Sequence, residues 1–475
     1  MSADRTQTFS RTRWLVLLAI AILIVIVVNP FSLFFLNDDF DSLPVYGQGE
    51  FIHKRGTRLF VELSLSLDFH LYGTQAWGYI LTNLLIHISC CFAGLIWCKK
   101  MAKNFGTVLN NNFLLLGGIL FMWFAFHSET VFWTISRTAS LGLLCFFATW
   151  LCFFKTGDNK LWLAAGFVFM LCGLFSYETL MLVPLQIVLW HWLLPVASPQ
   201  KKYTKWFLIV CLVAIAVYLP VRRYITLEWI GSYEAKEIYA FNLMSLAKNY
   251  GSLLLRTFVP PMQNKMLAAG IGGLFVLCTA IMATIIIRKR QGGKWWWFLM
   301  LNWLLSYVLF TSLGIDMGGY ESERYLYVPS FFFSVWVMYS FSLLNTANAV
   351  KYIIAVCLIA YHAVFFVAAL SQFRHAGQLA KTVIKTIADT PVGLGETTAL
   401  ENLPDKAFGI PLFRLGIKNG LKWLHPAYDT AKLAVASRLL NVKKATTNEA
   451  LFKSGYDTIT KTLTIKFFPN QKNDD

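Results

Sequence analysis

The sequence predicts an all-α polytopic membrane protein with a small α+β domain at its C-terminal end. Of the 475 residues, 57% are hydrophobic and only 14% are charged, whereas a soluble domain carries about 25% charged residues. Apolar runs long enough to cross a bilayer, about 20 residues, recur along the first part of the chain. From residue 373 onward these runs shorten, and charged residues, Gly and Pro return. We therefore predict a transmembrane module over residues 1–372 and an extracytoplasmic domain over residues 373–475.

The apolar runs predict about eleven membrane spans. They lie near residues 14–36, 76–98, 112–127, 136–154, 160–176, 179–196, 206–225, 266–288, 295–312, 325–345 and 351–371. Several are short for a bilayer, so we expect them to tilt or to lie partly in the interface. No small-residue cleavage site follows the first run, Trp14 to Leu36, which is expected to be an anchor rather than a removed signal.

Basic residues predict the orientation of these spans. They gather before the first span, after the second, and in the connections after the fourth, sixth and eighth: Arg5, Arg11, Arg13; Lys99, Lys100, Lys103; Lys155, Lys160; Lys201, Lys202, Lys205; Arg288, Lys289, Arg290, Lys294. All of these groups lie on one side if the N-terminus is cytoplasmic, as the positive-inside rule requires. Segments 37–75, 227–265 and 313–324, and the chain after residue 371, then lie on the extracytoplasmic side.

The distribution of charged residues and cysteines excludes other classes of protein. The net charge is +17, but the positive residues set topology and form no patch, so we do not expect nucleic-acid binding. The nine cysteines fall in or beside apolar runs without metal-type spacing. They predict neither a disulfide framework nor a zinc site.

The extracytoplasmic segments have their own periodicity. Phe60 to Leu67 alternates apolar and polar residues, which is typical of a strand or of a helix lying in the interface. We expect amphipathic interfacial helices in segment 227–265, ended by Pro260 and Pro261. In the C-terminal domain, His375 to Ala388 predicts a helix. The β-branched and aromatic residues from Thr462 to Phe468 predict a strand.

An acidic stretch, Asn37-Asp38-Asp39-Phe40-Asp41, follows the first apolar run directly. Two adjacent carboxyl groups repel each other, so that one holds its proton more tightly than the other. The stretch is either a solvated cap where the chain leaves the lipid or a functional site. Asp38 and Asp39 are therefore candidate catalytic residues.

Other polar residues fall at the same membrane face or within the spans. Asn83 and His87 share one helix face, either to join two helices by hydrogen bonds or to line a site. The remaining candidates lie at the ends of spans: Arg58, His127, Glu129, Arg137, Glu178, Glu323 and Arg324. Ionisable residues at such positions are costly and often functional. If they converge on one cavity, cations would hold a lipid phosphate and a carboxylate would accept a proton from a hydroxyl group.

Four segments resemble the GT-C superfamily of glycosyltransferases, which use polyprenyl-phosphate sugars. They are Asn37 to Phe40, the stretch from Arg58 through Asp68 to His87, His127 to Arg137, and Glu323 to Ser330. The chain is most similar to the protein O-mannosyltransferase-like branch that includes the transmembrane TPR-containing proteins. Ser176-Tyr177-Glu178 is similar to the family's Ser-Lys-Glu, with Tyr177 in place of the Lys, and no TPR array follows.

The resemblance implies an inverting glycosyltransferase of the hexosyltransferase class. Asp38 or Asp39 would be the catalytic base, with Asp38 favoured. Donor phosphate would be bound by Arg137, Arg324, Arg58 and His127. The sugar or acceptor would be bound by Glu129, Glu178, Glu323, Asn83 and His87.

The resemblance also sets expectations for the partners of the chain. The donor would be a sugar on a polyprenyl phosphate such as undecaprenyl phosphate, and mannose is one sugar that the branch transfers. The acceptor would be a surface glycan or lipopolysaccharide, or alternatively a protein. We expect no cofactor and no divalent metal, and a location in a bacterial inner membrane with the site on the periplasmic side. A transporter or flippase of a lipid-linked sugar is the second alternative.

Overall fold

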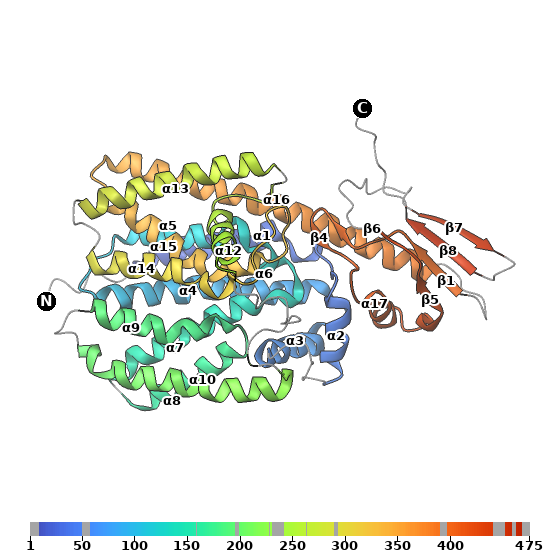
Figure 1. The fold of residues 1–475 in the computed structure, drawn as a ribbon, viewed down its shortest axis with the longest axis horizontal. Coiled ribbons are helices and arrows are strands. Elements are labelled where there is room, and N and C mark those ends of the chain that lie inside the picture. The colour runs from blue at the N-terminus through green and yellow to red at the C-terminus, as the bar shows by residue number, and fades with distance from the viewer. Residues whose placement is uncertain are drawn as a thin grey trace.

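The computed structural model describes residues 9–49, 58–157, 159–194, 199–227, 229, 242–262, 264–288, 293–389, 397–439, 452–457 and 462–467. It is a bundle of long helices that lie side by side, with a small sheet-containing unit at one end (Figure 1). Helices α2 and α3 lie at the end of the bundle that carries this unit. The acidic stretch is therefore close to the C-terminal domain in space, although the two are far apart in sequence.

The helices of the bundle are, in chain order, α1 (Arg11–Val28), η1 (Pro30–Ser32), α2 (Asp39–Gly47), α3 (Leu59–Tyr72), α4 (Ala76–Asn104), α5 (Asn111–Met122), η2 (Ala125–His127), α6 (Ser128–Phe132), η3 (Thr134–Ser136), α7 (Thr138–Lys155), α8 (Leu161–Leu174), η4 (Glu178–Leu182), α9 (Val183–Leu193), η5 (Pro199–Tyr203), α10 (Thr204–Thr226), α12 (Leu243–Arg256), α13 (Lys265–Arg288), α14 (Gly293–Leu305), η6 (Val308–Phe310), η7 (Glu323–Leu326), α15 (Tyr327–Leu343) and α16 (Asn348–Asp389). The prefix η marks short 3-10 turns.

The described residues contain seven helices that are long and apolar enough to cross a membrane. An eighth is obtained if α5 and the segment Ala125–Phe132, bent by 48° relative to each other, count as one span. Helices α8, α9 and α14, at three of the predicted spans, have only 14, 11 and 13 residues. A perpendicular span needs about 20 residues. The structure supports a multi-span membrane protein, but it does not confirm the predicted count of eleven.

The centre of the bundle is formed by α4, α7 and α15, which pack through aromatic side chains. Trp97 of α4 is fully buried, and its ring centroid lies 5.8 Å from that of Phe147 in α7 and 6.0 Å from that of Phe331 in α15. Gly94 permits this approach, because a Cβ atom there would lie 2.3 Å from the Phe331 ring. Helices α1, α10, α13 and α16 leave most of their apolar surface exposed, as expected for helices that face lipid.

The C-terminal unit combines a four-stranded sheet with one α-helix. Its elements are β1 (Thr397–Glu401), β2 (Leu403–Pro404), β3 (Lys406–Ala407), β4 (Ile410–Pro411), α17 (Ile417–Leu424), η8 (Thr430–Lys432), β5 (Leu433–Val435), β6 (Arg438–Leu439), β7 (Phe452–Asp457) and β8 (Thr462–Phe467). The sheet has the order β5-β1-β8-β7, with β1 parallel to β5 and β8, and β7 antiparallel to β8. Strand β8 occupies the stretch whose composition predicts a strand.

The structure makes two sequence-based expectations more specific. The predicted change at residues 372–373 falls inside α16, a 42-residue helix whose apolar first half continues without a break into a polar second half. Residues 60–67 are helical in α3 rather than a strand, and Val61, Leu65 and Asp68 are buried along one face. In segment 227–265, residues 230–241 lie outside the described part, and α12 follows them and ends before Pro260.

Candidate active site

The acidic stretch changes from an extended chain into helix α2 at Asn37. Asn37 has a left-handed backbone, with φ of +41°, which Asn tolerates better than most residues. Asp38 is the N-cap of α2 and Asp39 is its first residue. The two neighbouring carboxyl groups have different hydrogen-bond partners and different exposure, which separates the roles that they can play.

Asp39 is a completely buried acid. Its Oδ2 accepts a hydrogen bond from the backbone N–H of Leu36 at 2.9 Å, and its Oδ1 accepts one from the backbone N–H of Ile135 at 3.1 Å. Burial raises the pKa of Asp39 to about 8, and the charge of Asp38 acts in the same direction, although the two backbone N–H groups oppose the rise. Asp39 therefore holds its proton at neutral pH and joins α2 to the turn before α7.

Asp38 is the accessible acid of the pair, with a half-buried side chain. Its Oδ1 accepts a hydrogen bond of 2.5 Å from Nδ2 of Asn37. Hydrogen bonding to a carboxylate favours the charged form. Of the two predicted catalytic acids, only Asp38 is therefore both accessible and in contact with a donor that favours its ionised form.

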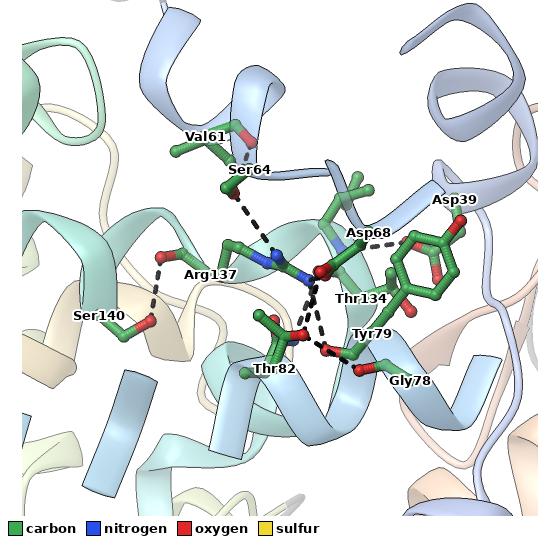
Figure 2. Close-up of polar contacts among 12 residues, drawn as sticks. Asp39, Val61, Ser64, Asp68, Gly78, Tyr79, Thr82, Thr134, Arg137 and Ser140 are labelled. Atoms are coloured by element: carbon green, nitrogen blue, oxygen red, sulfur yellow. Dashed lines mark hydrogen bonds and ion pairs between the residues drawn. The ribbon is translucent and has the colours of Figure 1, made fainter. Parts of the chain in front are cut away.

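Arg137 and Asp68 form a buried ion pair beside Asp39 (Figure 2), with Nη2 2.5 Å from Oδ2. The side chains are 0% and 4% exposed. Thr82 donates a hydrogen bond to Oδ1 of Asp68 at 3.0 Å, and Arg137 donates to the carbonyl oxygen of Tyr79 at 3.3 Å. Arg137, predicted to bind the donor phosphate, is thus held by protein groups in this structure.

Arg58, unlike Arg137, is neither fully buried nor part of a described ion pair. It is the half-buried N-cap of α3 and makes no ion pair within the part of the chain that the structure describes. Its charge acts on Glu62 and Glu178. Tyr46 of α2 interacts electrostatically with Glu62, Arg58 and Asp38, so Arg58 and Asp38 each lie near Tyr46.

Two further ion pairs join α6 and α12 to the turn before α15. Nη1 and the backbone N–H of Arg324 both bind the carboxylate of Glu129, and the N–H lies 2.9 Å from Oε2. The Arg324 side chain is 15% exposed. Glu323 is completely buried; it pairs with Arg256 at 2.5 Å and accepts a hydrogen bond from Ser128. Glu129 and Glu323 thus fix two arginines rather than facing an open space.

Glu178 keeps more access than the other predicted glutamates. Its Oε1 lies 2.7 Å from Nη1 of Arg222, and its side chain is 35% exposed. The preceding residue, Tyr177, donates a hydrogen bond to the carbonyl oxygen of Arg324 at 3.1 Å. The backbone N–H of Phe60 donates to the carbonyl oxygen of Phe175 at 3.2 Å. Through these contacts the elements that carry Arg58, Glu178 and Arg324 touch one another.

The structure places the remaining three predicted residues in the packing between helices. Asn83 donates to the carbonyl oxygens of Trp133 and Thr134 at 3.1 and 3.3 Å. His87 contacts the Tyr327 hydroxyl at 2.7 Å, and His127 contacts the Ser330 hydroxyl at 2.6 Å. All three are completely buried. Asn83 supports the turn that carries Ile135 and Arg137, whereas the histidines join α4 and η2 to α15.

Comparison with known proteins gives matches at the level of structure. No protein family and no curated protein matches the sequence. The archaeal oligosaccharyltransferase AglB from Archaeoglobus fulgidus, solved with an inhibitory peptide and a dolichol-phosphate, is 11% identical with a TM-score of 0.50, over 87% of this chain and 63% of that one. ArnT from Cupriavidus metallidurans, solved bound to undecaprenyl phosphate, is 12% identical with a TM-score of 0.48, over 92% and 87%. Arabinofuranosyltransferase AftD from Mycobacteria is 12% identical with a TM-score of 0.40, over 92% and 33%.

The likeness to the archaeal enzyme decides the architecture. The chain has the GT-C fold. The resemblance to this superfamily that the sequence shows is confirmed as a likeness of fold, and the O-mannosyltransferase-like branch is not confirmed. The chain spans less than two thirds of the length of the archaeal enzyme.

Several residues that shape the site of this GT-C fold were not among the predicted site residues. Asp68 and Glu62 are buried acids in α3, and Arg222 and Arg256 are buried cations near the ends of α10 and α12. The signal that could have found them is the one used for Arg137, an ionisable residue on a mostly apolar helix. Asn37 is the other omission, because only the structure shows that it orients its neighbour.

The buried acids of α2 and α3 predict the pH dependence of stability. Burial raises the pKa of Glu62 to about 8, against the opposing charge of Arg58. Because the folded state holds this proton and the unfolded state releases it near pH 4.5, unfolding becomes easier as the pH rises toward 8, by about 1.4 kcal/mol per pH unit. Thermal unfolding from pH 4 to 9 should show the wild type losing stability relative to Glu62→Gln over this window. Parallel curves for the two proteins would contradict the protonation of Glu62 in the folded state.

Proposed function

We propose that this protein is an integral-membrane glycosyltransferase that transfers a sugar from a polyprenyl-phosphate donor to a hydroxyl group. The observation that carries the proposal is the half-buried, accessible Asp38 beside the buried, protonated Asp39, with Arg58 and Asp38 both near Tyr46. A structure of the same fold contains a dolichol-phosphate. The distribution of basic residues supports a site on the extracytoplasmic side, in our proposal the periplasmic face of a bacterial inner membrane.

In the proposed reaction Asp38 accepts the proton of the acceptor hydroxyl group. The acceptor oxygen forms a bond to the anomeric carbon while the bond from this carbon to the phosphate oxygen breaks. Polyprenyl phosphate leaves with the electron pair, and the single displacement inverts the anomeric centre. The charge of the leaving phosphate is stabilised by Arg58, with Arg324 as a second cation. Glu178, the most exposed of the predicted glutamates, contacts the sugar or the acceptor.

The other predicted residues hold this arrangement in place. Glu129 and Glu323 orient Arg324 and Arg256, and Asn83 supports the turn before α7. Arg137 is neutralised by Asp68 and stabilises the junction of α3, α4 and α7. Because the arginines supply the positive charge, we propose that no divalent metal takes part.

The acceptor that we favour is a surface glycan or lipopolysaccharide, since the sequence carries no TPR array. Mass spectrometry of surface glycans and glycoproteins from cells with and without the protein would show which of them loses a sugar. The reaction is tested directly with the purified protein in lipid vesicles and a panel of polyprenyl-phosphate sugars. EDTA is added to test whether transfer proceeds without a divalent metal. Release of polyprenyl phosphate with transfer to an acceptor supports the proposal. Movement of the lipid-linked sugar across the vesicle without its consumption would replace it with transport.

Arg58 provides a test of the phosphate site. Arg58→Gln removes a cation without a described ion pair, so the donor should bind less tightly and its KM should rise about tenfold to hundredfold, as for a lost charge-assisted hydrogen bond. Arg58→Lys should recover part of the loss because it restores the charge. Arg223→Gln, at an exposed arginine on α10, is the matched control. A donor KM unchanged in Arg58→Gln would remove this residue from the phosphate site.

A further inference from the structure

The C-terminal unit reaches the acidic stretch through one short segment, residues 405–420. The backbone N–H of Asn37 donates to the carbonyl oxygen of Leu412 at 2.7 Å. The backbone N–H of Leu415 donates to Oδ1 of Asn37 at 3.1 Å. Asn37 is completely buried between the two units. Its backbone and its side chain are thus both held by the C-terminal unit, through main-chain groups that are present whatever the side chains at 412 and 415.

These contacts determine which way the Asn37 amide faces. The N–H of Leu415 can only donate, so the atom that it meets must be the amide oxygen. The amide nitrogen then faces the other way, where it donates to Oδ1 of Asp38 at 2.5 Å. The direction of this amide follows from the hydrogen-bond network. The C-terminal unit therefore controls the hydrogen bond that orients Asp38.

The packing of α17 against α2 around this contact leaves no room for a side chain at Gly416 or Gly420. Gly416 has φ of +81°, and a Cβ atom there would lie 3.0 Å from the backbone nitrogen of Asp41 and 3.1 Å from Cβ of Phe40. A Cβ atom at Gly420 would lie 2.8 Å from the Phe40 ring. Nδ2 of Asn419 donates to Oδ1 of Asp41 at 2.6 Å. Helix α17 and α2 thus fit together because both contact glycines lack side chains.

The same segment also binds the loop that leads to Arg324. Glu321 pairs with Lys406 at 2.8 Å and with Arg414 at 3.0 Å. Although partial burial alone would raise the pKa of Glu321, the two cations lower it below its usual value. The carboxylate is therefore charged at neutral pH, and the pairs tie segment 405–420 to the residues just before Glu323 and Arg324. One segment thus holds both the acid-bearing and the cation-bearing sides of the candidate site.

We propose that segment 405–420 of the C-terminal unit is a positioning element of the active site, which orients Asp38 through Asn37 and fixes its place relative to Arg324. The proposal rests on the proposed function, since Asp38 must be the base for its orientation to matter. Asn37 and Gly416 are positioning residues, because they act on the reaction through Asp38.

Two variants test this element from its two sides. Asn37→Gly removes the amide but accepts the left-handed backbone without strain. Gly416→Ala keeps Asn37 but places a methyl group against α2. Gly106→Ala is the control, because Gly106 also has a positive φ, +65°, but a Cβ atom there meets open space. Gly106→Ala therefore introduces the backbone strain of an alanine at positive φ but no contact with the candidate site.

We expect Asn37→Gly and Gly416→Ala to lower kcat about tenfold to hundredfold, the range for a misplaced catalytic group, with the donor KM nearly unchanged. Loss of the hydrogen bond disfavours the ionised form of Asp38, so the acidic limb of the kcat–pH profile should move to higher pH. Gly106→Ala should keep the wild-type profile. A variant that only lost folded protein would lower kcat equally at every pH, and this outcome, or unchanged kcat and pH profile in both variants, would overturn the positioning role.

The wild type and Asp38→Asn are measured in the same series, which separates this proposal from the function on which it rests. An active wild type with an inactive Asp38→Asn establishes the base, and the two positioning variants then decide the role of the C-terminal unit. If the wild type transfers no sugar from any donor of the panel, both proposals fall. Elution as a single species in size-exclusion chromatography and the temperature of unfolding show whether each variant is folded.

Discussion

Asp38→Asn is expected to abolish sugar transfer while leaving the protein folded. Asp38 makes no side-chain cap to α2, so its replacement removes no capping hydrogen bond from the helix. Loss of a general base typically lowers the rate about 10²- to 10⁴-fold. The asparagine has the same shape but accepts no proton at neutral pH, so kcat should fall with little change in the donor KM.

Asp39→Asn should have the opposite pattern. Both oxygens of Asp39 accept backbone N–H groups, and an asparagine would turn its own N–H₂ group toward one of these donors. A buried donor left without a partner costs about 1–3 kcal/mol, so the temperature of unfolding should fall. Transfer per folded molecule should fall much less than in Asp38→Asn.

The pair of variants is informative because the sequence makes both acids candidates, and only the family resemblance favours Asp38 over Asp39. Rates are measured in vesicles at equal amounts of folded protein, with Glu401→Gln in the C-terminal sheet as the control for a partly exposed carboxylate. If Asp39→Asn eliminated transfer in folded protein while Asp38→Asn retained it, Asp39 would be the base. The interpretation of its burial would then be wrong. Full transfer in both variants would remove the acidic stretch from the reaction.

Much of the architecture follows from properties that the sequence displays directly. Long apolar runs and the basic residues between them predict the membrane spans, because both reflect the cost of placing charge in lipid. The same logic predicts eleven spans, a count that the structure does not confirm, since α8, α9 and α14 are apolar but shorter than a perpendicular span needs. An apolar composition marks burial in protein as well as in lipid, and only three-dimensional packing distinguishes the two.

The candidate site also has features that the sequence predicts and features that only the structure shows. The sequence predicts the types of the site residues and their place at the ends of spans. In the structure, elements that touch one another carry Asp38, Asp39, Arg58, Glu178 and Arg324. The ion pairs cannot be predicted from the sequence, because the two partners come from distant parts of the chain: Asp68 pairs with Arg137, and Glu178 with Arg222. The sequence therefore predicts arginines as phosphate ligands without showing that a buried acid already neutralises one of them.

The Asp68–Arg137 pair makes the second prediction with a large expected effect. Asp68→Asn leaves the Arg137 guanidinium buried without its counter-charge, in a place where both side chains are almost completely inaccessible. Breaking a buried ion pair by removing one partner typically costs about 3–5 kcal/mol. We expect a strong fall in the temperature of unfolding and in the yield of folded protein. The partly exposed pair Glu401–Lys466 gives the control, since Glu401→Gln should cost at most about 1 kcal/mol.

The double variant Asp68→Leu with Arg137→Met separates stability from donor binding at this pair. Replacing both members of a buried ion pair with apolar residues is often neutral or stabilising, so the double variant should recover most of the stability that Asp68→Asn loses. If Arg137 only holds α3, α4 and α7 together, the folded double variant should bind the donor with nearly wild-type KM. If it folds but its donor KM rises at least tenfold, Arg137 contacts the phosphate during the reaction, and the ion pair with Asp68 must open when the lipid binds.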